Sequence, residues 1–119
     1  MTTYKDLIVW QKAIKLVLEI YKITEKFPKE EIFGITSQIR RASVSIPSNI
    51  AEGKMRGGNI EFRRFLTIAF GSGAELETQI LICKKLPKTC NLDYNKVDSS
   101  LEEVMKMLNK LISGLEPNA

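Results

Sequence analysis

The chain has 119 residues, of which 44% are hydrophobic and 27% are charged, a size and balance typical of one compact domain with its own core. The 18 Lys and Arg residues outnumber the 14 Asp and Glu residues, which gives a formal net charge of +4, and histidine is absent. Without histidine the chain cannot form a Ser-His or Cys-His nucleophile pair and lacks the commonest zinc ligand, so we expect no enzyme activity, no metal and no cofactor.

The first 20 residues are interrupted by charged side chains, including Lys5 and Lys12. Such a segment is neither a signal peptide nor a membrane span, so we expect a cytoplasmic protein with one domain over residues 1–119. The two cysteines, Cys83 and Cys90, are too few for a disulfide scaffold and have no metal-ligand partners. We therefore expect one core thiol and one loop thiol.

Apolar residues recur at helical spacing in four segments. Short connections rich in Pro, Gly and Asn separate these segments, and such connections favour antiparallel neighbours. The pattern predicts an all-α fold, an antiparallel up-and-down four-helix bundle. The expected helices cover residues 5–26, 36–53, 60–86 and 94–116, with Asn59 and Asp93 as N-caps and Gly53 as a left-handed C-terminal residue.

The first expected helix carries two apolar arcs side by side and only a narrow polar face. One arc includes Trp10 and Tyr21, and the other begins at Val9. A monomeric bundle could not cover both arcs, so the pattern predicts self-association, the alternative being a monomer with a partly apolar surface. We expect the oligomer interface to include the second arc and three residues of later helices, namely Val9, Ala13, Leu16, Ile20, Ile23, Ser45, Ser48 and Ile68.

The second expected helix contains Pro47 within the stretch SVSIPSNIAEG. Its apolar stripe, which includes Ile46 and Ile50, keeps helical phase across the proline, so we expect the helix to continue and to be kinked there. On the outward side Ser45 and Ser48 are small. This surface suits the close approach of a helix from the same subunit, a neighbouring subunit or an external partner.

The third expected helix contains the stretch FLTIAFGSGAEL, which could also be a strand leading into a glycine-rich phosphate loop. Leu76 stands where the third glycine of such a loop belongs, and no further strand-helix repeat completes a parallel sheet. A helix in which Gly71 and Gly73 let a neighbouring backbone come close is therefore favoured. Ile68 and Ile82 lie on a second apolar face of this helix.

Three stretches, DLIVWQKA, FPKEEIFGITSQIRRASVSIPSNIAEG and EFRRFLTIAFGSGAELETQI, resemble the small bacterial four-helix bundle proteins encoded in intervening sequences of 23S ribosomal RNA genes. The resemblance covers nearly the whole chain. It implies an antiparallel bundle that assembles into a ring-shaped homopentamer. It also implies a relation to the accessory variability protein of diversity-generating retroelements, which binds nucleic acid and a reverse transcriptase through a positively charged surface. A reverse transcriptase encoded nearby would then be a protein partner.

The positive charge is concentrated between residues 34 and 64, where six cations and two carboxylates sum to +4. We expect these cations to contact RNA or DNA phosphates, and we expect no base stacking because few exposed aromatic residues accompany them. A structural role for several of them is the alternative. A protein-protein scaffold therefore stays open beside a ring-forming, nucleic-acid-binding accessory factor. The six cations are Arg40, Arg41, Lys54, Arg56, Arg63 and Arg64.

Overall fold

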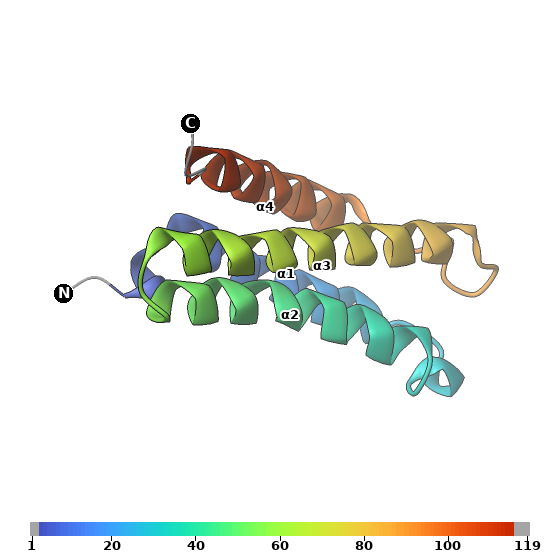
Figure 1. Ribbon diagram of the computed structural model, residues 1–119. Coiled ribbons are helices and arrows are strands. Elements are labelled where there is room, and N and C mark those ends of the chain that lie inside the picture. Colours follow the sequence, from blue (N-terminus) through green and yellow to red (C-terminus); the bar gives the residue numbers. More distant parts are fainter. Residues whose placement is uncertain (1–2, 116–119) are drawn as a thin grey trace.

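Four long helices build the protein in the computed structural model, which describes residues 3–115. No strand occurs in that range, so the all-α prediction with four helices is confirmed (Figure 1). The fourth expected helix was extended to Glu116, which lies outside the described residues. The helices are α1 (Ile8–Thr24), α2 (Ile35–Met55), α3 (Asn59–Lys85) and α4 (Asn95–Gly114), with short 3-10 helices η1 (Tyr4–Asp6) and η2 (Lys29–Glu31).

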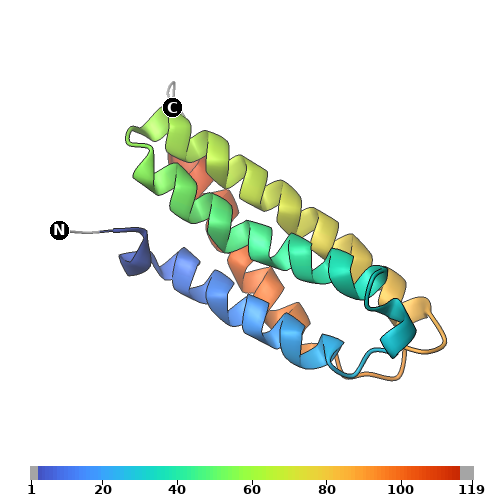
Figure 2. The same cartoon turned by 90° about the horizontal axis from the view of Figure 1, so that it is seen from below.

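The helices lie side by side in an elongated body of 47 × 26 × 21 Å. The connections α1–α2 and α3–α4 lie at one end, called here the loop end, and the α2–α3 turn lies at the opposite end with both termini, called here the turn end (Figures 1 and 2). Gly53 of α2 packs directly against Phe65 of α3. A Cβ atom placed on Gly53 would be only 2.5 Å from the Phe65 Cβ atom, so this crossing requires a glycine.

The turn end differs from the expected capping. Gly53 lies inside α2 and has no positive φ, so its predicted left-handed role is wrong. Gly57 and Gly58 adopt that conformation instead, with φ of 79° and 84°, and Gly58 rather than Asn59 is the N-cap of α3. Gly53 instead allows α2 to pack closely against Phe65, and Gly57 and Gly58 supply the left-handed backbone of the turn.

At the start of α4 the predicted cap is one residue too early, because Tyr94 occupies the N-cap position. The Asp93 side chain still stabilises the helix start, since its Oδ1 atom accepts a hydrogen bond from the Asn95 amide at 2.9 Å. The aspartate therefore accepts a hydrogen bond from a free amide at the helix start, as an N-cap side chain does, although it lies one residue before the N-cap.

The hydrophobic core corrects the prediction for the first helix. Five residues assigned to the oligomer interface lie in the core of a single chain, where α2 and α4 pack against α1. The neighbouring arc, which includes Trp10 and Tyr21, is the more exposed one. Trp10 and Tyr21 could have indicated this, because such side chains bury their apolar bodies but keep a polar atom near water. The five corrected residues are Val9, Ala13, Leu16 and Ile20, each at most 1% exposed, and Ile23 at 8%.

α2 continues through Pro47, which is itself buried between Ile46 and Ile50 in the helix. Next to the proline, the Ser45 hydroxyl lies 2.8 Å from the Ser72 hydroxyl of α3. Ser45, one of the residues predicted for the oligomer interface, therefore contacts a helix of its own chain. Ser48, one turn further along, is exposed.

Candidate nucleic-acid interface

The six cations that the sequence groups together fall into two sets in the structure. Arg40 and Arg41 lie in the first half of α2, towards the loop end, and the other four lie around the α2–α3 turn. Between Arg40 and Arg56 the helix rises by about 24 Å, at roughly 1.5 Å per residue. The six therefore do not form one patch, and each set has to be judged by its own contacts.

At the turn end, carboxylates partly neutralise the cations. Arg56 pairs with Glu52 at 2.8 Å and lies 3.9 Å from Glu61, while Arg64 donates to Glu61 at 2.9 Å. The hydrogen bond from Arg64 holds the pKa of the Glu61 carboxyl below its usual range. These pairs are exposed, so they add little to stability, but each reduces the charge available to a phosphate.

The same set also packs on aromatic rings. The guanidinium groups of Arg56 and Arg64 lie 5.0 and 4.6 Å from the centre of the Phe65 ring, and the Lys54 ammonium lies 5.4 Å from the centre of the Phe62 ring. Such cation–π contacts hold the side chains against the α2–α3 hairpin. The alternative that several of these cations are structural is therefore supported by their contacts.

Arg63 joins the start of α3 to the end of α4. Its Nε atom donates a hydrogen bond to the Ile112 carbonyl oxygen at 3.2 Å. Carbonyl groups in the last turn of a helix have no partner within the helix and carry partial negative charge, so a cation placed there stabilises the helix end. Arg63 therefore has a structural contact of its own.

At the loop end, Arg40 is anchored between α1 and α2. Its Nε atom donates to the Thr24 hydroxyl at 2.9 Å, and that hydroxyl donates to the Ile20 carbonyl at 2.7 Å. The guanidinium group also lies 4.5 Å from the centre of the Tyr21 ring. Arg41 differs, because it is exposed and has no carboxylate partner among the described residues.

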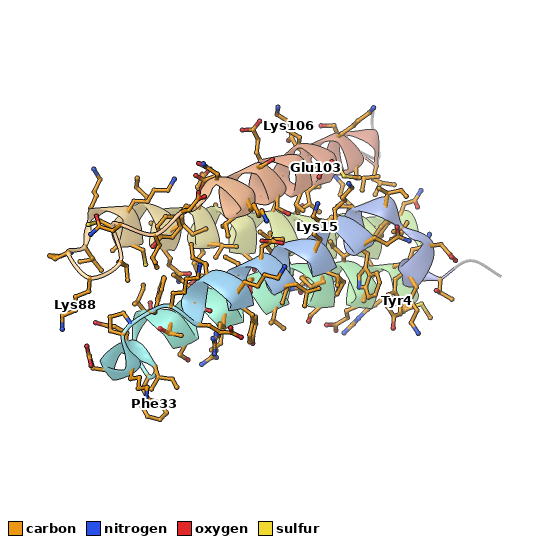
Figure 3. The ribbon with its side chains drawn as sticks, turned by 180° about the vertical axis from the view of Figure 1, so that it is seen from behind. Tyr4, Lys15, Phe33, Lys88, Glu103 and Lys106 are labelled. Atoms are coloured by element: carbon orange, nitrogen blue, oxygen red, sulfur yellow. The ribbon has the colours of Figure 1, made fainter. Side chains whose placement is uncertain are left out.

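A shallow groove of about 590 Å³ lies beside these two arginines, called here the α2 groove. Its lining contains two cations and no carboxylate. Phe33 is one of its lining residues and is 95% exposed, and Figure 3 shows its ring pointing away from the bundle. The residues that line the α2 groove are Tyr21, Ile32, Phe33, Thr36, Ser37, Arg40, Arg41, Val44 and Ser45.

The sequence interpretation missed Phe33 as a surface aromatic. A usable signal was its position outside the predicted helices, in the connection that ends at Gly34, where no helical stripe buries it. Phe27, in the same connection, is buried, so aromatic content alone does not separate the two. The expectation of few exposed aromatic residues near the cations does not hold at the α2 groove, which Phe33 and the 38% exposed Tyr21 both line.

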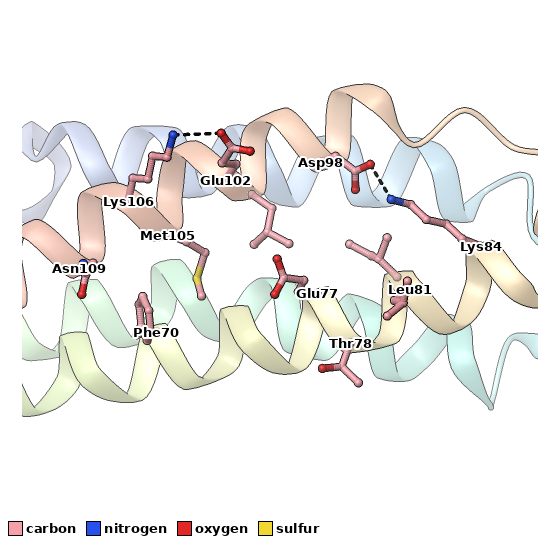
Figure 4. A pocket seen from close by; sticks show the side chains of 12 residues that line it. Phe70, Glu77, Thr78, Leu81, Lys84, Asp98, Glu102, Met105, Lys106 and Asn109 are labelled. Atoms are coloured by element: carbon pink, nitrogen blue, oxygen red, sulfur yellow. Dashed lines mark hydrogen bonds and ion pairs between the residues drawn. The ribbon is translucent and has the colours of Figure 1, made fainter.

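A second groove, of about 710 Å³, runs between α3 and α4, and is called here the α3–α4 groove (Figure 4). Phe70, Leu81 and Met105 contribute apolar surface to it. Four of its five charged residues are paired, since Lys84 lies 2.7 Å from Asp98 and Lys106 lies 3.1 Å from Glu102, and the fifth is the carboxylate Glu77. This pairing leaves less positive charge for phosphate than the α2 groove offers.

The described residues contain no cluster of His, Cys, Asp or Glu that could hold a metal ion. Cys83 is buried, and burial raises the pKa of its thiol, which makes it a poor nucleophile. Cys90 is exposed, so the expected division into a core thiol and a loop thiol is confirmed.

Within residues 3–115 no helix combines the length and the apolar character that a membrane span needs.

Two predicted interface residues remain on the surface. Ile68, on α3, is 41% exposed, and Ser48, on α2, is also exposed. Both are available to a second copy of the chain, unlike the five α1 residues of the core.

The family model described as 23S rRNA-intervening sequence protein matches residues 5–110. The match covers all four helices except the last turn of α4. A search of the curated proteins finds no match.

Proposed function

Because the chain belongs to the 23S rRNA-intervening sequence protein family, we propose that it is a non-enzymatic, homo-oligomeric accessory protein that binds nucleic acid through a basic surface. The observation that carries this proposal is the environment of Arg41. This residue is exposed, lacks a carboxylate partner within residues 3–115, and lies beside a groove whose lining contains no acidic residue. A guanidinium group in this setting can contact a phosphate without first breaking an ion pair.

Self-association is supported by the apolar surface of a single chain. Within residues 3–115 twelve large hydrophobic side chains are exposed, among them Ile8, Leu18 and Ile68. Where such side chains gather into one patch, the patch is commonly covered by a partner. In a ring of five copies, the number that the resemblance implies, the formal charge would be 5 × (+4) = +20, which would attract nucleic acid from a distance in a salt-dependent way.

The proposal includes finer features of the bundle. We take the helices as antiparallel neighbours, because successive connections alternate between the loop end and the turn end (Figures 1 and 2). We also take α2 as bent at Pro47, since the proline cannot donate a hydrogen bond to the Ser43 carbonyl. The proposed location is the cytoplasm.

Filter binding with RNA and DNA at two salt concentrations tests the proposal. Arg41→Gln should bind more weakly than the wild type at low salt. Lys110→Gln removes the same charge from an exposed position on α4 and should bind as the wild type does. Absence of binding by the wild type at low salt, or an equal loss in both variants, would overturn the proposal.

A protein-protein scaffold is the second candidate, and the α3–α4 groove is the observation that favours it. The groove combines exposed Leu81 with Phe70 and Met105, and its lining also contains the ion pairs Lys84–Asp98 and Lys106–Glu102. A helix or peptide with an apolar stripe could lie there. A reverse transcriptase encoded beside the gene would be one such partner.

A further inference from the structure

We infer that the α2 groove binds single-stranded nucleic acid, with a base stacked on the Phe33 ring and an adjacent phosphate held by Arg41. This inference rests on the proposed function and adds the class of ligand and the mode of contact. It follows from an exposed aromatic ring and a guanidinium group without a carboxylate partner that both line the same groove.

Phe33 is presented on an ordered backbone. Before it, the Ile32 amide donates to the Lys29 carbonyl at 3.2 Å, and after it the Gly34 amide donates to the Glu31 carbonyl at 3.0 Å. The Gln38 amide then donates to the Gly34 carbonyl at 3.1 Å as α2 begins. Because the backbone on both sides of Phe33 is already ordered, little backbone freedom is lost when a flat ligand stacks on the Phe33 ring.

The charge distribution decides where the phosphate lies. The Glu31 carboxylate is close to the start of α2, since its Oε1 atom would be 3.1 Å from a Cβ placed on Gly34, and it is outside the lining of the α2 groove. A phosphate at the helix N-terminus would meet this carboxylate. Arg41 and Arg40 lie further along α2, where the groove has no acidic residue. We therefore assign phosphate binding to Arg41, and Arg40 adds long-range attraction.

The same features favour a single strand over a duplex. In a duplex the base faces are stacked on one another and cannot reach an isolated ring, whereas in a single strand they are free to stack on an aromatic side chain. A duplex would use the cations alone. An acidic protein segment would also use the cations, but would gain less from an unobstructed flat ring.

The test compares labelled single-stranded oligonucleotides with a duplex of the same sequence, in the full chain. Phe33→Ala should weaken single-strand binding at least about fivefold, the lower limit for loss of one stacked base, and leave duplex binding unchanged. Phe33→Trp should retain single-strand affinity, and the fluorescence of the new tryptophan should be quenched on binding. Ile60→Ala is the matched control, because it removes a 75% exposed apolar side chain at the other end of the bundle.

Each outcome decides the inference. If Phe33→Ala binds single strands as tightly as the wild type does, or if the fluorescence of Phe33→Trp does not change on binding, the stacking inference is overturned. The proposed binding of nucleic acid would still stand. Failure of the wild type to bind any oligonucleotide at low salt overturns the proposed function together with the stacking inference. Phe33-dependent binding of polyglutamate in preference to single strands assigns the groove to an acidic protein and also overturns the inference. Far-UV circular dichroism checks that each variant keeps its helices.

Discussion

The Arg40 Nε atom donates a hydrogen bond to the Thr24 hydroxyl across 2.9 Å and so ties α2 to α1. Its neighbour Arg41 is exposed and has no carboxylate partner within residues 3–115. Two adjacent arginines thus have different roles, because successive helical positions point about 100° apart. One holds the bundle together and the other is available to a ligand.

This difference predicts unequal effects of the two arginines on stability. Arg40→Ala removes a hydrogen bond to Thr24 and a cation–π contact with Tyr21, and we expect it to lower the free energy of unfolding by about 1–2 kcal/mol. Arg41→Ala should change that free energy by no more than about 0.5 kcal/mol. Urea unfolding followed by circular dichroism measures both values, and equal losses in the two variants would contradict the assignment.

Gly53 and Gly71 form a matched pair for testing the α2–α3 crossing. A Cβ on Gly53 would collide with Phe65, so Gly53→Ala should destabilise the protein by about 1–3 kcal/mol. A Cβ on Gly71, within α3, would meet nothing within 4 Å. Gly71→Ala should therefore stabilise the monomer fold by up to about 1 kcal/mol through higher helix propensity. Thermal unfolding of the two variants distinguishes these directions, and stabilisation by Gly53→Ala would refute the close crossing.

The corrected core changes what substitutions in α1 should do. Leu16 and Ile20 are fully buried in one chain, so Leu16→Glu or Ile20→Glu should unfold the protein rather than dissociate an oligomer. Ile68→Glu, at an exposed position of α3, should keep the helical signal and lower the mass measured by light scattering. Folded, smaller particles of Leu16→Glu would show that the core is assigned incorrectly, and an unchanged oligomer mass in Ile68→Glu would remove Ile68 from the interface.

The buried hydroxyl of Tyr94 should make the protein lose stability at high pH. This hydroxyl donates to the Thr89 carbonyl at 2.9 Å, and burial raises its pKa from 10.0 to about 12. Because the folded state holds this proton more tightly than the unfolded chain does, the contribution is present below pH 10 and is lost as the pH rises from 10 to 12. The Tm of the wild type should fall more across this window than the Tm of Tyr94→Phe, in which this position cannot ionise. Parallel Tm curves would contradict the prediction.

The sequence was sufficient for the number, type and approximate bounds of the helices, because their apolar periodicity is strong. The continuation of α2 through Pro47 was also predictable, since Ile46 and Ile50 keep one phase on either side of it. The inward face of α1 was not, because periodicity shows that two arcs are apolar without showing which one the other helices cover.

The site was less predictable than the fold. Contacts such as Arg63 with Ile112 join residues 49 positions apart, and no local pattern encodes which cations such contacts will occupy. The exposure of Phe33 depends likewise on how the α1–α2 connection folds. The sequence identified the right class of residues, and tertiary structure determined which of them remain available.

The dependence of the binding constant on salt concentration tests the central claim most directly. If Arg41 contacts a phosphate, the slope of log Kobs against log salt concentration should become shallower by roughly one in Arg41→Gln, with no such change in Lys110→Gln. The same slope in the wild type and Arg41→Gln would contradict phosphate binding by Arg41 and with it the proposed basic surface.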